Sequence, residues 1–179
     1  ISIEPLPSTE KPNDPWTRLG TLTVLDDDGD EVELARFVTP YGAPAEYELD
    51  LTAMAPLLHD TCTIRGAISS YGEGPTWKMS VTLTYALRDA GVRRPGLVET
   101  VFGVTEVDAA EPMLEATVTI PEGMISPRLR IISTGHATDG RGANEFVSCP
   151  HVLRIDGEIV ALWRPWTEGS GRLRRLNPW

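Results

Sequence analysis

Two histidines and one carboxylate lie close together in the C-terminal half of the chain and are the side chains best suited to chemistry. They are His136, Glu145 and His151, and they fall on polar segments between hydrophobic runs. Polar side chains held on loops by a rigid sheet are a common location for binding and catalysis in β proteins. A carboxylate is suited to acid–base work, and neighbouring histidines are suited to orient it through hydrogen bonds.

Metal binding by these histidines is a weaker interpretation than hydrogen bonding across the loops. The chain has 3 histidines in all, and the third, His59, follows a separate segment that resembles a helical turn. We therefore predict no metal site and no cofactor. If Glu145 is buried, we expect Arg18, His136 or His151 to pair with it, because an unpaired buried carboxylate is costly. Replacing Glu145 with alanine is then expected to lower stability at least as much as any activity.

The elements that must position these side chains are predicted to be almost entirely β-strands. Apolar residues alternate with polar ones from Trp77 to Leu87, and shorter runs of the same period occur at 47–51, 114–120 and 129–133. This period of two marks a strand with one buried face. Asp28-Gly29 and Asp156-Gly157 each separate two apolar runs, which predicts two hairpins. One helical turn is predicted from Thr52 to Leu58, with Thr52 as its N-cap.

A polar segment rich in glycine and arginine divides the strands into two groups. Many short strands with Gly- and Pro-rich turns are typical of a sandwich or jelly roll. We therefore predict an all-β fold with a first jelly-roll lobe at residues 1–88, a linker at 89–97 and a second lobe at 98–179.

Composition excludes several classes of protein. The 179 residues carry a formal net charge of -10, which argues against a general nucleic-acid binder because such proteins need a basic surface. No apolar run is long enough to span a bilayer. The chain starts with Ile rather than Met, so processing or a removed signal or anchor stays open.

Two further patterns leave alternatives open. Cys62 and Cys149 fit two separate buried thiols better than a disulfide, which would require their Cα atoms to lie within bonding range. The acidic run 26–31 resembles part of a calcium loop, but Val24 occupies the position of the first ligand. A solvated hairpin tip is therefore the favoured interpretation of this run.

Several motifs along the chain carry a resemblance to a known family. They are Asp14-Pro-Trp16-Thr17-Arg18, then Ala35-Arg-Phe-Val-Thr-Pro-Tyr41 and Glu48-Leu-Asp-Leu-Thr52, and later Ser133-Thr-Gly-His136, Gly142-Ala-Asn-Glu145-Phe146 and His151. Together they make the chain similar to the peptide-N-glycosidase F family, bacterial amidases that release N-linked glycans from asparagine. The resemblance implies two adjacent jelly rolls with the active site at their interface. It also implies that both lobes are shortened, since some of the family's terminal segments have no counterpart here.

The same resemblance implies that two of the three catalytic acids are replaced. The family's principal catalytic Asp follows the Trp of its Asp-Glu-Trp-Asp-Arg motif, and that position is Thr17 here. A second carboxylate corresponds to Ser69, whereas the third corresponds to Glu145 and is retained. Losing an essential base lowers a rate by orders of magnitude. Asp14 or Glu73 would have to substitute for the lost acids in an active enzyme.

Three functional hypotheses follow. The favoured one is a non-catalytic double jelly-roll module that binds a protein partner or an N-glycan or glycopeptide, or serves as a subunit of an assembly. Its binding residues would be Trp16, Arg18, Asp14, His136 and His151. The alternative is an amidase with rearranged acids that uses Glu145. A copper-dependent monooxygenase on a related fold is disfavoured because it needs more histidines. The resemblance also implies a location outside the cytoplasm.

Overall fold

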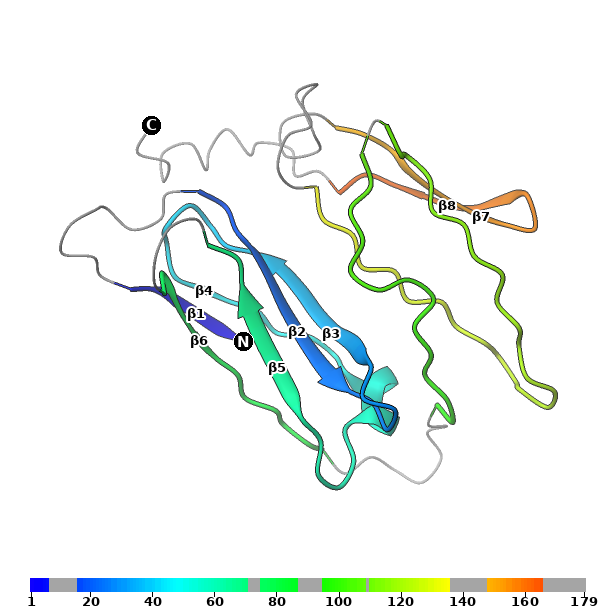
Figure 1. The fold of residues 1–179 in the computed structure, drawn as a ribbon, viewed down its shortest axis with the longest axis horizontal. Helices are drawn as coiled ribbons and strands as arrows, with labels where there is room; N and C mark the ends of the chain where they lie inside the picture. The colour runs from blue at the N-terminus through cyan, green and yellow to red at the C-terminus, as the bar shows by residue number, and fades with distance from the viewer. Residues whose placement is uncertain (7–15, 71–74, 87–94, 109, 136–147, 166–179) are drawn as a thin grey trace. The chain divides into compact units, whose positions relative to one another are not determined.

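The computed structural model describes most of the chain, and the described residues are those numbered 1–6, 16–70, 75–86, 95–108, 110–135 and 148–165 (Figure 1). They fall into two compact units, divided between Gly103 and Val104. We call the described residues up to 103 the N-terminal unit and those from 104 the C-terminal unit. The predicted linker at 89–97 lies partly outside the described residues, so the domain limits stay a prediction.

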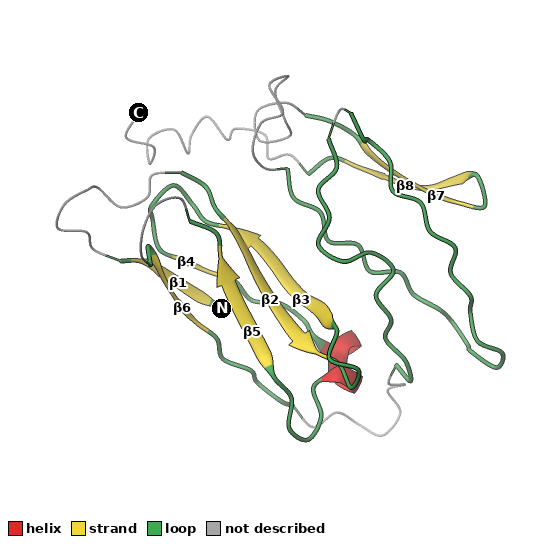
Figure 2. Ribbon diagram, in the orientation of Figure 1, coloured by secondary structure: helices red, strands yellow, loops and turns green. Residues whose placement is uncertain are grey.

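The fold is all-β, as predicted, and Figure 2 shows strands joined by loops with a single short helix among the described residues. The N-terminal unit holds two three-stranded sheets. One has the order β4-β1-β6 and the other has the order β3-β2-β5. The strand bounds are β1 Ser2–Pro5, β2 Leu19–Leu25, β3 Glu31–Val38, β4 Ala45–Glu46, β5 Ile64–Ile68 and β6 Trp77–Ser80.

The core of the N-terminal unit lies between its two sheets and around its helical turn. Ile3 on β1 and Trp77 on β6 cluster with Phe37 on β3, which joins the two sheets. A second cluster includes Leu22 on β2 and Leu34 on β3, which are 2% and 0% exposed. Burying such apolar side chains is the main driving force for the sandwich.

The β2–β3 hairpin forms at the predicted Asp28-Gly29 turn. Gly29 has φ +87°, a conformation that glycine adopts without steric cost, and the Asp26 carboxylate accepts hydrogen bonds from the backbone N–H of Asp28 and Asp30. The pairing register shifts between Leu22 and Thr23. A shift of this kind is typical of a β-bulge, which here lets two successive residues of β3, Leu34 and Ala35, both be buried.

The predicted helical turn is present, but its N-cap was predicted wrongly. The 3₁₀ helix η1 spans Thr52–Leu57 with Leu51 as N-cap and no capping side chain. The Thr52 hydroxyl instead donates a hydrogen bond to the Asp50 carboxylate, which also accepts from the backbone N–H of Thr52. Thr52 therefore begins the helix, and its side chain is held by a local turn rather than by the helix terminus.

The C-terminal unit contains the β7–β8 hairpin, formed by β7 His151–Ile155 and β8 Glu158–Trp163. Its turn is the predicted Asp156-Gly157, and both residues have positive φ, 50° and 84°, as a two-residue hairpin turn requires. Every fully buried side chain among the described residues belongs to the N-terminal unit.

Several predicted strands are shorter than expected or missing. β6 ends at Ser80, residues 81–86 are not a strand, and Leu87 lies outside the described residues. The runs 47–51, 114–120 and 129–133 are not strands either. Alternation predicts which side chains share a face, but a strand also needs a hydrogen-bonded partner. Cys62 and Cys149 form no disulfide, as favoured above, but both are partly exposed rather than buried. Within the described residues, no helix is both long and apolar enough to cross a membrane.

Candidate functional site

One end of the β3-β2-β5 sheet gathers several of the predicted site residues. Trp16, Thr17 and Arg18 lead directly into β2, and Ser69 directly follows β5. The backbone N–H of Ser69 donates to the carbonyl oxygen of Leu19 at 2.9 Å. Because β2 and β5 are antiparallel, the start of one strand meets the end of the other. Positions 17 and 69, separated by half the N-terminal unit in sequence, therefore lie at the same end of one sheet.

A reciprocal pair of hydrogen bonds fixes Arg18 against the strand on its other side. The backbone N–H of Arg18 donates to Thr39 Oγ1 at 2.8 Å, and the backbone N–H of Thr39 donates to the Arg18 carbonyl at 2.8 Å. Arg18 is 7% exposed and Thr39 is 0% exposed. Trp16 is 48% exposed, so a flat aromatic side chain remains accessible beside this ordered backbone.

Thr39 is a site-supporting residue that sequence reasoning missed. It lies in the run 35–41 that carries the resemblance, but no role was assigned to it. Replacing Thr39 with valine keeps the shape and leaves the buried N–H of Arg18 without its acceptor. We expect the free energy of unfolding to fall by about 1–3 kcal/mol, measured by urea unfolding. Thr39→Ser keeps the hydroxyl and should lose clearly less. Equal stability of the valine variant and the parent would contradict this prediction.

Three of the predicted site residues lie outside the described residues. These are Asp14, His136 and Glu145. The predicted pairing of Glu145 with Arg18, His136 or His151 therefore stays a prediction, as does the effect of Glu145→Ala.

His151 begins β7 and packs against an aromatic neighbour across the hairpin. His151 pairs with Trp163 in the strand register, and their rings meet edge to face with centroids 5.6 Å apart. The indole N–H of Trp163 donates to Ser133 Oγ at 2.9 Å. His151 is thus held beside a half-buried tryptophan whose polar atom is already engaged. This arrangement presents an imidazole and an aromatic ring together, which suits binding by stacking and hydrogen bonding.

The environment of His151 predicts a pH effect. Partial burial lowers the pKa of His151 from its ordinary value of 6.5. The unfolded chain then binds the proton more readily than the folded one, so stability is lost as the pH falls from 6.5 through the lower folded-state pKa. We expect His151→Gln to lose less stability than the parent over that interval, measured as melting temperature against pH. An imidazole titration midpoint at or above 6.5 by NMR would contradict this.

The prediction that the chain has no metal site applies to all residues, whereas the structure describes only part of them. Among the described residues, no group of three or more His, Cys, Asp or Glu side chains is placed to hold a metal ion. The run 26–31 forms the tip of the β2–β3 hairpin, where Asp26 accepts the turn's own backbone hydrogen bonds.

The fold and these contacts define an all-β protein with sandwich-like sheets and a polar end on one of them. Comparison with known families adds that residues 105–179 match a family model described as Peptide-N-glycosidase F, C terminal. This match supports the family resemblance for the C-terminal part of the chain. No curated protein and no solved structure matches the chain.

Proposed function

We propose that this chain is a non-catalytic β-sandwich module, related to peptide-N-glycosidase F, that binds a glycan-bearing or protein partner. One observation carries the proposal. Positions 17 and 69, where the resemblance implies catalytic carboxylates, hold Thr and Ser and lie at one end of the β3-β2-β5 sheet.

The chemistry at this end supports binding rather than hydrolysis. Cleaving a side-chain amide requires a base for water, and a hydroxyl does not act as that base at neutral pH without an activating partner. Among the described residues at this end, the ranges 16–19, 38–41 and 68–70 contain no Asp or Glu. The end is thus made of hydroxyl groups, one buried arginine and an exposed aromatic ring.

Trp16 supports a binding role. At 48% exposure it offers an accessible indole face, and aromatic side chains are favoured anchors for sugar rings and protein surfaces. The backbone hydrogen bonds of Arg18 to Thr39 anchor the segment that carries Trp16. A pre-ordered aromatic loses little conformational entropy on binding.

The test is incubation of the full chain with a fluorescent N-glycopeptide. Fluorescence anisotropy measures binding, and mass spectrometry measures conversion of the glycosylated Asn to Asp. We expect saturable binding that weakens in Trp16→Ala, with no conversion. Tyr85→Phe, at a side chain 71% exposed and far along the chain, serves as the control variant. Conversion that disappears in Glu145→Ala would overturn the non-catalytic proposal. Absence of binding would exclude the glycopeptide and direct the search to a protein partner.

An amidase with rearranged acids is the second candidate. It is favoured by one observation, which is that Glu145 lies inside the segment 105–179 that matches the family model. In this case Asp14 or Glu73 would replace the lost carboxylates. Glu145→Ala should then abolish conversion of Asn to Asp, and so should either Asp14→Asn or Glu73→Gln. For either candidate function, we also propose a location outside the cytoplasm, as the family resemblance implies. We likewise propose two lobes, at residues 1–88 and 98–179.

A further inference from the structure

Strand β5 is an edge of the β3-β2-β5 sheet, and within the described residues it pairs with β2 alone. The backbone N–H of Ser69, just beyond β5, donates to the Leu19 carbonyl oxygen. Bonded positions alternate along an antiparallel ladder, so this bond fixes which residues face β2. The backbone N–H and C=O groups of Ile64, Gly66 and Ile68 therefore point away from β2, to the open side of the sheet.

The other edges of the two sheets in this unit carry features that discourage pairing. β3 has a register shift and the charged side chains of Glu33 and Arg36, β4 has 2 residues, and β6 carries the exposed Lys78. β5 has one charged side chain, Arg65, which forms an ion pair with Glu31. The middle of β5 is exposed. Charges, bulges and shortness protect edges, so β5 is the edge most open to another strand.

The sequence of β5 is nearly symmetric about its centre. It reads Ile64-Arg-Gly-Ala-Ile68, with Gly66 in the middle. Two copies of this strand, placed antiparallel about a twofold axis at Gly66, bring Ile64 of each copy opposite Ile68 of the other. Arg65 then lies opposite Ala67 of the second copy. No like charges meet across this pairing, and the apolar stem of the arginine packs beside a small side chain.

We propose that two copies of this chain associate through the β5 edge and form one antiparallel sheet of order β3-β2-β5-β5-β2-β3. Ile64, Gly66 and Ile68 of each copy supply the backbone donors and acceptors of the new ladder. An edge filled in this way no longer offers unpaired backbone groups to other chains. The association uses the side of the sheet rather than its polar end, so it does not rest on the binding function proposed above.

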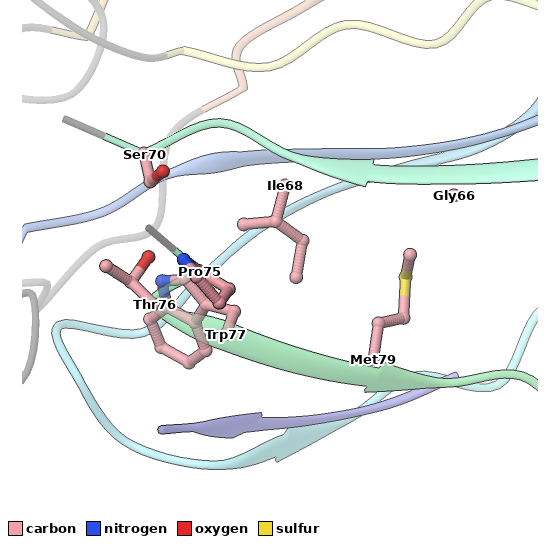
Figure 3. Close-up of a pocket in the computed structure, with 7 residues that line it drawn as sticks. All are labelled: Gly66, Ile68, Ser70, Pro75, Thr76, Trp77 and Met79. Carbon is pink, nitrogen blue, oxygen red and sulfur yellow. The ribbon is translucent and has the colours of Figure 1, made fainter. Parts of the chain in front are cut away.

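The inner face of β5 gains burial from this association. Figure 3 shows the side chain of Ile68 extending from β5 toward β6, and a Cβ at Gly66 would lie 2.2 Å from Met79 Cε. Ile64 packs against the cluster that contains Leu22. Ile64 and Ile68 are nevertheless only partly buried, because an edge strand leaves one flank open. Each isoleucine covers that flank of the other across the twofold axis.

The twofold axis also keeps the most acidic segment of each copy away from its equivalent. Val24 pairs with Ile64, so the acidic hairpin tip 26–31 lies at the Ile64 end of the sheet. The axis places the two tips at opposite ends of the joined sheet, at least the length of β5 apart, which is about 13 Å. Charges more than about 8 Å apart are largely screened at physiological ionic strength. The net charge of -10 therefore opposes the association only weakly.

Sedimentation velocity of the full chain at physiological ionic strength, over about 10 μM to 1 mM, tests the association. A single short ladder is a small interface, so we expect a dimer with a Kd of about 0.1 mM. Ala67→Glu places a carboxylate opposite Arg65 of the second copy and should tighten the dimer about fivefold, whereas Ala67→Lys should weaken it about fivefold. Ala116→Glu and Ala116→Lys, at an exposed alanine in the C-terminal unit, change the net charge equally and should leave Kd unchanged.

Amide hydrogen exchange locates the interface. The amides of Ile64, Gly66 and Ile68 should exchange more slowly as the protein concentration rises, whereas those of Arg65 and Ala67 already bond to β2 and should not change. A chain that stays monomeric over the whole concentration range would overturn the proposal. A dimer that responds alike to Ala67→Glu and Ala67→Lys would overturn it too, as would concentration-dependent protection on another strand instead of β5.

Discussion

Replacing Leu34 with alanine should lower the free energy of unfolding of the N-terminal unit by about 2–5 kcal/mol. Leu34 is 0% exposed and lies on β3 within the cluster that also contains Leu22, Val24 and Met54. Truncation removes favourable burial and leaves a cavity that well-packed strands fill only in part. A unit of this size has a total stability of the order of 5–15 kcal/mol, so the loss is a large fraction of the whole.

Amide hydrogen exchange measures this loss in the N-terminal unit alone. Amides of the β2–β3 ladder report the opening free energy of that unit, whereas a global unfolding curve mixes both units. Leu49→Ala is the matched control because Leu49 is 40% exposed, and its effect should stay below about 1 kcal/mol. If the two leucine variants lost equal stability, the described core of the unit would be wrong.

The sequence predicted those parts of the fold that depend on local turn chemistry. Asp28-Gly29 and Asp156-Gly157 both form the expected hairpins, because a glycine with positive φ is required at each turn and is present at each. The helical turn at 52–57 was also predicted. Its cap was not, because Thr52 can bond either to the helix terminus or to Asp50, and a sequence does not choose between these two local geometries.

Non-local structure was predicted less well. The alternating runs 114–120 and 129–133 have the right period for strands, but the described backbone there pairs with no neighbouring strand. Alternation fixes side-chain faces, while ladder hydrogen bonds depend on a partner far away in the sequence.

The candidate site shows the same limit. Thr17 and Ser69 were selected by resemblance, but their location at one sheet end follows from the register of β2 with β5. Among the described residues the indole N–H of Trp77 has no acceptor, and this was not foreseen, because an alternating pattern predicts that a tryptophan is buried but not whether its N–H finds an acceptor. Sequence reasoning therefore found candidate residues near the chain's motifs and missed those defined only by packing between sheets.

Replacing Gly20 with alanine should cost about 1–3 kcal/mol, because the new methyl group enters space held by an aromatic ring. Gly20 on β2 pairs with Phe37 on β3, and a Cβ at Gly20 would lie 2.2 Å from Phe37 Cε2 and 2.3 Å from Phe37 Cζ. The ring is 5% exposed and lies 5.0 Å from the ring of Tyr47, so it has little room to move. The pairing of an aromatic ring over a strand glycine thus explains why this position is glycine.

A double-mutant cycle separates this clash from a general effect of adding a methyl group. Phe37→Leu shortens the side chain, so Gly20→Ala should cost clearly less in that background, with a coupling energy of about 0.5–3 kcal/mol. Gly96→Ala is the control, since nothing lies within 4 Å of a Cβ built there. At Gly66 the clashing atom is the flexible tip of Met79, so Gly66→Ala should cost less than Gly20→Ala. Additive effects of the Gly20 and Phe37 substitutions in hydrogen exchange would show that the ring does not fill this space.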